Sequence, residues 1–166
     1  NYNGSEEFSM SVSDGEYSDS QNITVTVNAV NDAPTANAAS GATAEDQSVV
    51  VTLSGSDIDG DNLSFSLDTD ATNGSVTLDG SLATYTPNAN YNGDDSFSFS
   101  VSDGSESSSA SVSIGVTAVN DAPVLASTDD VSFDEDGSGS TSLSADDVDG
   151  DDLTFSISGG SDITAL

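Results

Sequence analysis

Apolar and polar residues alternate along much of this chain, which is the period of a β-strand that buries one face. Phe97, Phe99 and Val101 are separated by serines, and the same alternation runs through 112–116. It occurs again at 8–12, 23–27 and 63–67. No stretch shows the helical period, so the pattern predicts an all-β protein built from short strands.

Seven strands are predicted between residues 33 and 121, with turn-forming residues between them. They lie near 34–42, 48–54, 62–68, 75–78, 82–86, 95–102 and 108–119. Asp79 and Gly80 form a tight hairpin turn, because glycine accepts the positive φ that such turns need. Short strands in this number are typical of an antiparallel β-sandwich of the immunoglobulin or cadherin type.

A repeated string divides the chain into units. Val-Asn-Asp-Ala-Pro stands at 30–34 and returns 89 positions later at 119–123, and Asn-Tyr-Asn-Gly at 1–4 returns at 90–93. Asp-x-Asp-Gly-Asp at 57–61 returns at 147–151. We therefore expect a tandem, end-to-end array. Its parts are the C-terminal part of one repeat (1–32), a complete repeat (33–121) and the N-terminal part of another (122–166).

The charge of the chain limits its partners. Its 166 residues include 30 Asp and Glu but no Lys, Arg or His, for a formal net charge of −30. Such a chain cannot neutralise phosphates, so nucleic acid and direct contact with an anionic membrane are excluded as partners. Its carboxylates must be spread out, screened by salt or bridged by metal cations. Low hydrophobicity with high charge also fits disorder, but the regular alternation favours a folded chain.

Residue types that serve catalysis are scarce. The chain has no Cys, and without His or Lys its many hydroxyls lack a base, so we expect no enzyme activity and no catalytic residues. The carboxylate pair Asp94 and Asp95 could serve acid–base hydrolysis, but metal binding explains it better. There is no apolar run long enough to span a membrane.

Acidic residues fall into loops that an immunoglobulin-like strand order gathers at the two ends of the sandwich. At the end where the chain enters, the loops after the second and sixth strands adjoin the linker. The first loop carries Asp57, Asp59 and Asp61, the second carries Asp103, and the linker carries Asn31 and Asp32. Where it leaves lie Glu45, Asp46, Asp94, Asp95, Asn120 and Asp121. Stacking the repeats end to end would bring one cluster against the next.

Hard oxygen ligands in this number suit Ca²⁺, which accepts six to eight oxygens in flexible geometry. Mg²⁺ needs a stricter octahedron, and Zn²⁺ prefers the His and Cys that are missing. The loop at 57–61 is not an EF-hand, because Asn62 and Asp68 stand where glycine and glutamate are required. A solvated turn is the alternative. Recurrence of the loop at 147–151 favours calcium, which we expect as the bound cofactor.

In this order the strings Val-Asn-Asp-Ala-Pro, Glu-Asp, Asp-x-Asp-Gly-Asp, Tyr-Asn-Gly-Asp-Asp and Val-Ser-Asp-Gly resemble the cadherin-like tandem repeats of large bacterial RTX-type and biofilm surface adhesins. The resemblance implies a calcium-rigidified stalk, at the cell surface or secreted, that acts as a mechanical spacer in adhesion or biofilm formation. It covers the whole chain. Calcium ions and neighbouring repeats would be its partners.

The same resemblance implies the ligand sets. At the first joint they are Glu6, Asn31, Asp32, Asp57, Asp59 and Asp103. At the second they are Glu45 and Asp95 from one repeat, Asn120 and Asp121 from the linker, and Asp147 and Asp149 from the next repeat, whose motif ends at Asp151. One departure is that Asp94 aligns with Ser5, so the two joints could hold different numbers of ions.

Other functions remain open on the sequence alone. The repeats could themselves be adhesive, contacting glycan or self-associating, and strand edges in the partial repeats could pair into a filament. Tyr2, Tyr85 and Tyr91 could line a sugar-binding surface, although such aromatic residues more often pack in a core. The acidity could also be an adaptation to high salt.

Overall fold

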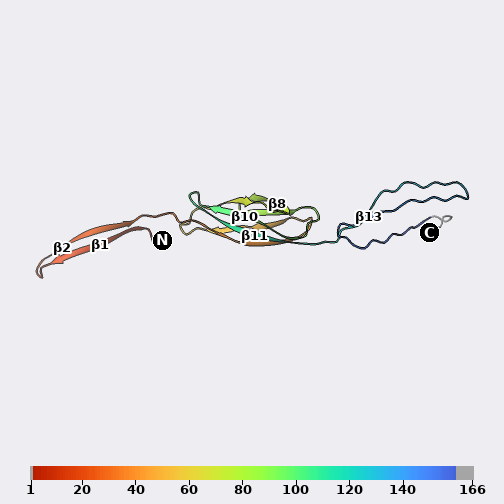
Figure 1. Ribbon diagram of the computed structural model, residues 1–166. Helices are drawn as coiled ribbons and strands as arrows, with labels where there is room; N and C mark the ends of the chain where they lie inside the picture. Colours follow the sequence, from red (N-terminus) through yellow and green to blue (C-terminus); the bar gives the residue numbers. More distant parts are fainter. Residues whose placement is uncertain (1, 160–166) are drawn as a thin grey trace. The chain divides into compact units, whose positions relative to one another are not determined.

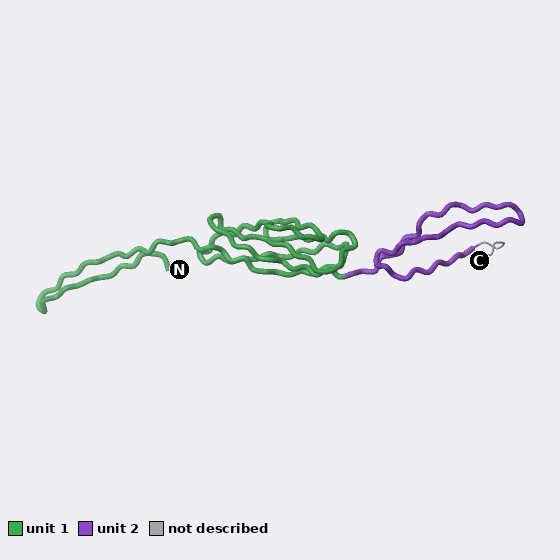
Figure 2. Tube along the Cα trace, viewed as in Figure 1, with its two compact units in different colours: residues 1–117 green, residues 118–166 purple. Residues whose placement is uncertain are grey.

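The computed structural model describes residues 2–159, which form β-strands and no helices (Figure 1). The chain divides into two compact units, residues 1–117 and residues 118–166 (Figure 2). The predicted end of the complete repeat at 121 lies close to this division. The predicted boundary at 32 falls inside the first unit and stays a prediction.

Residues 35–117 build an all-β sandwich. One sheet has the order β4 (Ala39–Ala44), β11 (Ser107–Thr117), β10 (Gly93–Ser102) and β7 (Ser64–Thr69). The opposing sheet has the order β5 (Val49–Thr52), β9 (Leu82–Pro87) and β8 (Gly74–Asp79). A separate two-stranded sheet pairs β3 (Thr35–Asn37) with β6 (Ser54–Ser56). The first two predicted strands are each divided, so nine strands replace seven.

The first predicted strand is divided because it serves two sheets. Its first part, β3, pairs antiparallel with β6, and after Ala38 its second part, β4, pairs with β11 in parallel. The predicted antiparallel β-sandwich is confirmed as the fold class, and the other described strand pairs are antiparallel. The parallel pairing of β4 with β11 is a departure that the prediction did not include. The predicted turn at Asp79 and Gly80 is confirmed, with Gly80 at φ +58°.

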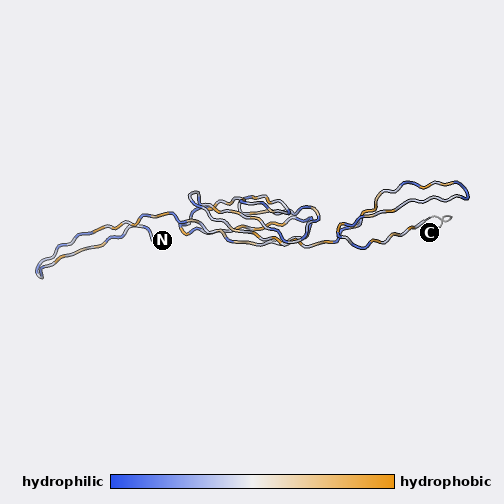
Figure 3. Tube along the Cα trace, in the orientation of Figure 1, coloured by the Kyte–Doolittle hydropathy of each residue, from blue (hydrophilic) through white to orange (hydrophobic). Residues whose placement is uncertain are grey.

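The core comes from the alternating positions of both sheets. Its fully buried members include Phe99, Val101 and Val112 from one sheet and Ala83 and Tyr85 from the other. Figure 3 shows the apolar segments interleaved with polar ones along the strands. Serines alternate with these apolar residues and line the outer face of the four-stranded sheet.

The hairpin of β1 (Gly4–Ser13) and β2 (Ser18–Val27) repeats β10 and β11. Its register, from Gly4 opposite Val27 to Ser13 opposite Ser18, matches Gly93 opposite Val116 to Ser102 opposite Ser107. Phe8 is nevertheless 51% exposed, whereas its counterpart Phe97 is 2% exposed. The hairpin therefore has the strand pairing of a repeat without the opposing sheet that buries its apolar face.

The second unit contains the short strands β12 (Val124–Leu125) and β13 (Ala145–Asp146), which pair antiparallel. Within residues 2–159 there is no helix long and apolar enough to cross a membrane.

Candidate metal centre

The first joint gathers three segments that lie far apart in the sequence. The backbone N–H of Asp32 donates to Oδ2 of Asp59 at 2.8 Å. Nδ2 of Asn31 donates to Oδ2 of Asp103 at 2.9 Å. The linker is thereby held to the loop between β6 and β7 and to the turn between β10 and β11, as the predicted strand order requires.

The loop at 57–61 closes around one carboxylate. Oδ1 of Asp57 accepts hydrogen bonds from the backbone N–H groups of Asp59 at 2.8 Å, Gly60 at 3.0 Å and Asp61 at 3.3 Å. Gly60 has φ +82°, a conformation that glycine adopts without strain. Oδ2 of Asp57 is buried and has no hydrogen-bond partner. The loop therefore fixes one oxygen of Asp57 and leaves the other unsatisfied.

Asp103 lies in a turn that keeps it ionised. Its Oδ1 accepts the backbone N–H groups of Ser105 at 2.6 Å and Glu106 at 2.7 Å. These bonds, with that from Asn31, lower the pKa of the Asp103 carboxyl; the Glu106 N–H contributes most. An anionic carboxylate is the form that binds a metal ion.

Glu6, the remaining predicted ligand of the first joint, lies on β1 opposite Val25. A hydrogen bond to Glu6 raises the pKa of the Tyr2 hydroxyl. Tyr2 in turn lines a cavity of about 260 Å³ together with Asn3, residues 28–30, Asp32 and Asp59. The linker residue Asp32 and the loop residue Asp59 thus line the same small cavity.

The second joint repeats the same hydrogen bonds inside the second unit. The N–H of Asp121 donates to Oδ2 of Asp149 at 2.6 Å, as Asp32 does to Asp59. Oδ1 of Asp147 accepts the N–H groups of Asp149 at 3.0 Å and Asp151 at 3.2 Å. Nδ2 of Asn120 bonds the carbonyl of Asp121 at 3.0 Å. The linker-to-loop arrangement is therefore a property of the repeat.

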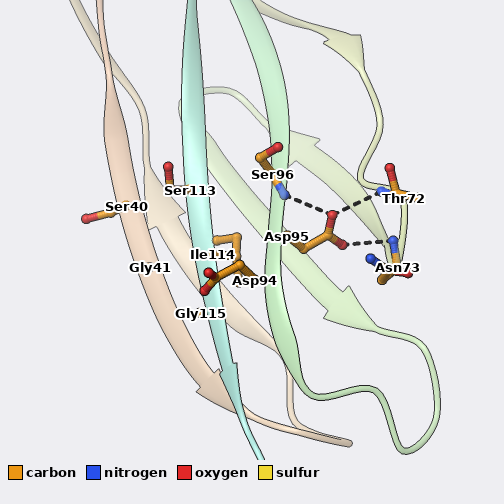
Figure 4. A pocket seen from close by; sticks show the side chains of 10 residues that line it. All are labelled: Ser40, Gly41, Thr72, Asn73, Asp94, Asp95, Ser96, Ser113, Ile114 and Gly115. Atoms are coloured by element: carbon orange, nitrogen blue, oxygen red, sulfur yellow. Dashed lines mark hydrogen bonds between the residues drawn. The ribbon is translucent and has the colours of Figure 1, made fainter.

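Asp95, predicted as a ligand at the other end of the repeat, has both oxygens engaged. Oδ1 accepts the N–H groups of Thr72 at 3.2 Å and Ser96 at 2.8 Å (Figure 4). Oδ2 accepts the N–H of Asn73 at 2.9 Å and the hydroxyl of Tyr85 at 3.0 Å. A carboxylate offers about four acceptor positions, and these four bonds use them. Asp95 therefore ties the segment before β8 to β10.

Burial and hydrogen bonding change the pKa values of Asp95 and Tyr85. Burial would raise the pKa of the Asp95 carboxyl, but the bonds from Ser96, Asn73, Tyr85 and Thr72 outweigh it, so the pKa is lowered. Burial, and then the bond to Asp95, raises the pKa of the Tyr85 hydroxyl. Tyr85 is fully buried, so the idea that it lines a sugar-binding surface is wrong.

The remaining acidic residues at this end differ in exposure. Glu45 is 4% exposed, and among the described residues it is the charged residue that is buried. Oδ1 of Asp46 accepts the N–H of Asn90 at 3.1 Å. Asp94 is exposed and contributes its backbone carbonyl, not its carboxylate, to a bond with the Tyr91 hydroxyl at 2.7 Å.

The carboxylates at the first joint are linked through N–H groups and do not converge on one point. Within the part of the chain that is described, no three Asp, Glu, His or Cys side chains are grouped closely enough to hold a metal ion as they stand. The donors are nevertheless all hard oxygens, and Oδ2 of Asp57 is buried without a partner, so the residues fit Ca²⁺.

Sequence reasoning missed the groups that engage Asp95. Thr72 and Asn73 were assigned no role, and Tyr85 was weighed as a core residue or a sugar-binding residue but not as a partner of Asp95. The alternation of Ala83 and Tyr85 with Thr84 and Thr86 could have placed Tyr85 inward. The bonds from Thr72 and Asn73 depend on a loop path that no periodicity indicates.

Several solved structures resemble this chain, with low sequence identity and low TM-scores. The endo-fucoidan hydrolase MfFcnA4 of glycoside hydrolase family 107 is 24% identical, over 70% of this chain and 19% of that one, with TM-score 0.44. Titin domains Z1Z2 in complex with telethonin are 13% identical over 69% and 62%, with TM-score 0.38. Domains 4–9 of the surface layer protein SbsC are 19% identical over 89% and 24%, with TM-score 0.34.

These scores carry no conclusion about activity, and this chain spans about a fifth of the hydrolase, 19% of its length. No curated protein matches the chain. A family model described as Bacterial Ig domain (Big_9) does match, over residues 31–115. That segment runs from the first joint into β11. It supports a bacterial Ig-like repeat, which is a broader class than the cadherin-like adhesin repeat suggested by the resemblance. Because the match spans more than half of the 166 residues, the chain belongs to the bacterial Ig domain family.

Proposed function

We propose that this chain is a stretch of calcium-rigidified extender repeats from an extracellular bacterial adhesin, and that it acts as a non-catalytic mechanical spacer. Membership of the bacterial Ig domain family supports an extracellular structural repeat. The observation that carries the calcium part is Oδ2 of Asp57, a carboxylate oxygen that is buried and has no hydrogen-bond partner. The chain has no Lys, Arg or His that could pair with this oxygen, and a bound metal cation would satisfy it.

The ligands of the proposed ion come from three segments. Asp57 would contribute its Oδ2, the linker Asp32, and the neighbouring turn Asp103. Rotation of the Asn31 amide by half a turn would present its oxygen, since the two ends of an amide are nearly alike in shape. Asp59 and Asp61 complete the set. At the second joint the counterparts are Asn120, Asp121, Asp147, Asp149 and Asp151.

The ion would tie the linker to the sandwich. Hydrogen bonds from Asp32 to Asp59 and from Asn31 to Asp103 already hold the linker. Because the carboxylates are not gathered beforehand, binding would have to draw them together against their mutual repulsion. Linker stiffness would therefore depend on calcium concentration.

The expected stabilisation is large relative to a small domain. For dissociation constants of about 10⁻³ to 10⁻⁴ M, as in extracellular modules, ~10 mM calcium adds roughly 1.4 to 2.7 kcal/mol for each site. Two or more sites would match a good part of the ~5 to 15 kcal/mol that stabilises a typical domain. We leave Asp95 outside the ligand set, because its four hydrogen bonds explain it as a structural residue.

The test uses the 166-residue chain. We expect calcium to raise its melting temperature and its radius of gyration in small-angle scattering, and a chelator to reverse both. Asp57→Asn should lose much of the calcium-induced rise in melting temperature, whereas Asp79→Asn, in an exposed hairpin turn, should keep it. Sodium chloride at matched ionic strength separates ligation from screening. Equal responses to calcium and to sodium in the parent chain would refute the proposal.

A further inference from the structure

The outer face of the four-stranded sheet carries a depression of about 690 Å³ between β4, β10, β11 and the segment before β8 (Figure 4). That volume is in the range of small-molecule binding sites, ~300 to 1,000 Å³. Its lining is mostly polar. Five of its lining residues lie in two rows across three strands, and the strand register defines these rows: Ser40, Ser96 and Ser113, and Asp94 and Gly115.

The first row consists of three hydroxyls. Ser96 on β10 is opposite Ser113 on β11, and Ser113 is opposite Ser40 on β4. The second row, the next outward-facing position on β10 and β11, consists of Asp94 and Gly115; Ala42 on β4 is opposite Gly115 but does not line the depression. Neighbouring strands are about 4.8 Å apart and alternate residues about 6.8 Å apart, so the rows form a polar floor around one bare position.

Gly115 is that bare position, and the fold does not require glycine there. A Cβ added to Gly115 would meet no atom within 4 Å, and its φ is not positive. Glycine inside a strand weakens it and often marks a place where a ligand or another backbone approaches closely. A residue that costs stability without a steric reason indicates such an approach.

The preceding repeat provides an internal comparison for this pair. Ser5 and Thr26 occupy the positions of Asp94 and Gly115, are also opposite each other, and bond through their hydroxyls at 2.9 Å. In the complete repeat both members of the pair differ. The result is an exposed carboxylate that faces an open position instead of a self-satisfied hydroxyl pair.

Hydroxyls elsewhere on the same face bond to one another. Ser66 pairs with Ser100 at 2.9 Å and Thr69 with Ser98 at 2.6 Å, while Asp68 accepts Ser100 and Ser109. By contrast, the carboxylate of Asp94 and the hydroxyls of the first row bond to no other side chain or backbone group in the described structure. The free hydrogen-bonding groups of this face are thus concentrated at the depression.

We propose that this depression is a binding site for a neutral saccharide, with Asp94 accepting hydrogen bonds from two neighbouring sugar hydroxyls and Ser40, Ser96 and Ser113 bonding to others over the bare backbone of Gly115. A chain of charge −30 repels anionic ligands. A single metal ion binds oxygens at 2.3 to 2.6 Å and cannot reach across both rows. A ligand with several hydroxyls can.

The site contains no residue of the proposed calcium ligand set, so it can be tested separately from calcium binding. In amide NMR of the 166-residue chain, methyl glucoside, mannoside and galactoside are titrated in turn. We expect at least one to shift the amides of Asp94, Ser96, Ser113 and Gly115 saturably, both with calcium and with chelator.

The double variant D94S/G115T recreates the Ser5–Thr26 pair and should weaken this binding roughly tenfold or more, since a charged hydrogen-bond acceptor is lost and the floor is covered. D94S and G115T alone should each weaken it, which keeps the test decisive if one variant folds poorly. Ser111→Thr, on the same strand outside the depression, should bind normally.

The result that would overturn the proposal is the lack of a saturable shift with any glycoside, or equal binding by D94S/G115T. Shifts of the same amides by Nα-acetyl-lysine methylamide or calcium chloride, but by none of the glycosides, would also overturn it, because the site would then be a cation site.

Discussion

Asp95→Ala removes the acceptor shared by Thr72, Asn73, Ser96 and Tyr85. The N–H groups of Thr72 and Ser96 are near the surface and can turn to water. The Tyr85 hydroxyl belongs to a fully buried residue, and leaving it unpaired costs about 1 to 3 kcal/mol. Loss of the partly buried bond to Asn73 adds about 1 kcal/mol. We therefore expect a loss of roughly 2 to 4 kcal/mol in the free energy of unfolding.

Tyr85→Phe separates the hydroxyl from the carboxylate. It removes one bond and leaves Asp95 with three donors, so about 0.5 to 1.5 kcal/mol should be lost. In the double variant no hydroxyl is orphaned, so the combined loss should fall short of the sum by about 1 kcal/mol or more. Asp79→Ala, an exposed turn variant, should stay within about 0.5 kcal/mol of the parent.

Urea unfolding followed by circular dichroism measures these differences, in chelator and in calcium. If Asp95 is structural, the loss appears in chelator and calcium stabilises the variant as much as the parent. A loss below about 0.5 kcal/mol in chelator would refute the structural account. Loss of the calcium response in Asp95→Ala alone would restore Asp95 to the ligand set.

Three further outcomes are expected. The folded-state pKa of Asp95 is lowered, so the contribution of its carboxylate to stability is complete above its unfolded pKa of about 3.9 and is lost as the pH falls through the folded-state pKa. In urea titrations, the difference in the free energy of unfolding between the parent and Asp95→Asn should therefore shrink as the pH falls through this range. Gly115→Thr should raise stability by about 0.5 to 1 kcal/mol, whereas Gly41→Ala should lower the melting temperature, because its Cβ would lie 2.7 Å from Val51 Cγ2. Phe97→Ala should cost about 3 to 5 kcal/mol and the equivalent Phe8→Ala under about 0.5 kcal/mol, measured by the same urea unfolding; equal losses would mean that Phe8 is covered.

Much of the fold could be predicted because it depends on local pattern. Phe97, Phe99 and Val101 alternate with serine, and this alone places them inside a sheet. Gly80 identifies a turn for reasons confined to its own φ. The parallel pairing of β4 with β11 joins segments about 70 residues apart, and alternation carries no information about which strands pair or in which direction.

The joints could be predicted to the level of segments but not of atoms. The repeated Val-Asn-Asp-Ala-Pro string and the 57–61 loop indicated which segments meet, and Asp32 does contact Asp59. Which carboxylate oxygens remain without a hydrogen bond depends on the directions of backbone N–H groups, so the sequence alone does not indicate the roles of Asp57 and Asp95. The sequence alone shows that Asp94 stands where the preceding repeat has Ser5. That Gly115 replaces Thr26 directly opposite this position is evident only from the strand register.

The parallel pairing of β4 and β11 sets how the sandwich responds to stretching. Tension applied along the chain would act through the linker before β3 and the segment after β11, so it pulls β4 and β11 lengthwise in opposite directions. Their six register pairs are then sheared together and cannot be unzipped one at a time. A proline at Ala42 should lower the rupture force in single-molecule stretching, and an unchanged force would place the resistance elsewhere. Each sandwich would thus behave as a clamp whose strength comes from sharing the force across many bonds.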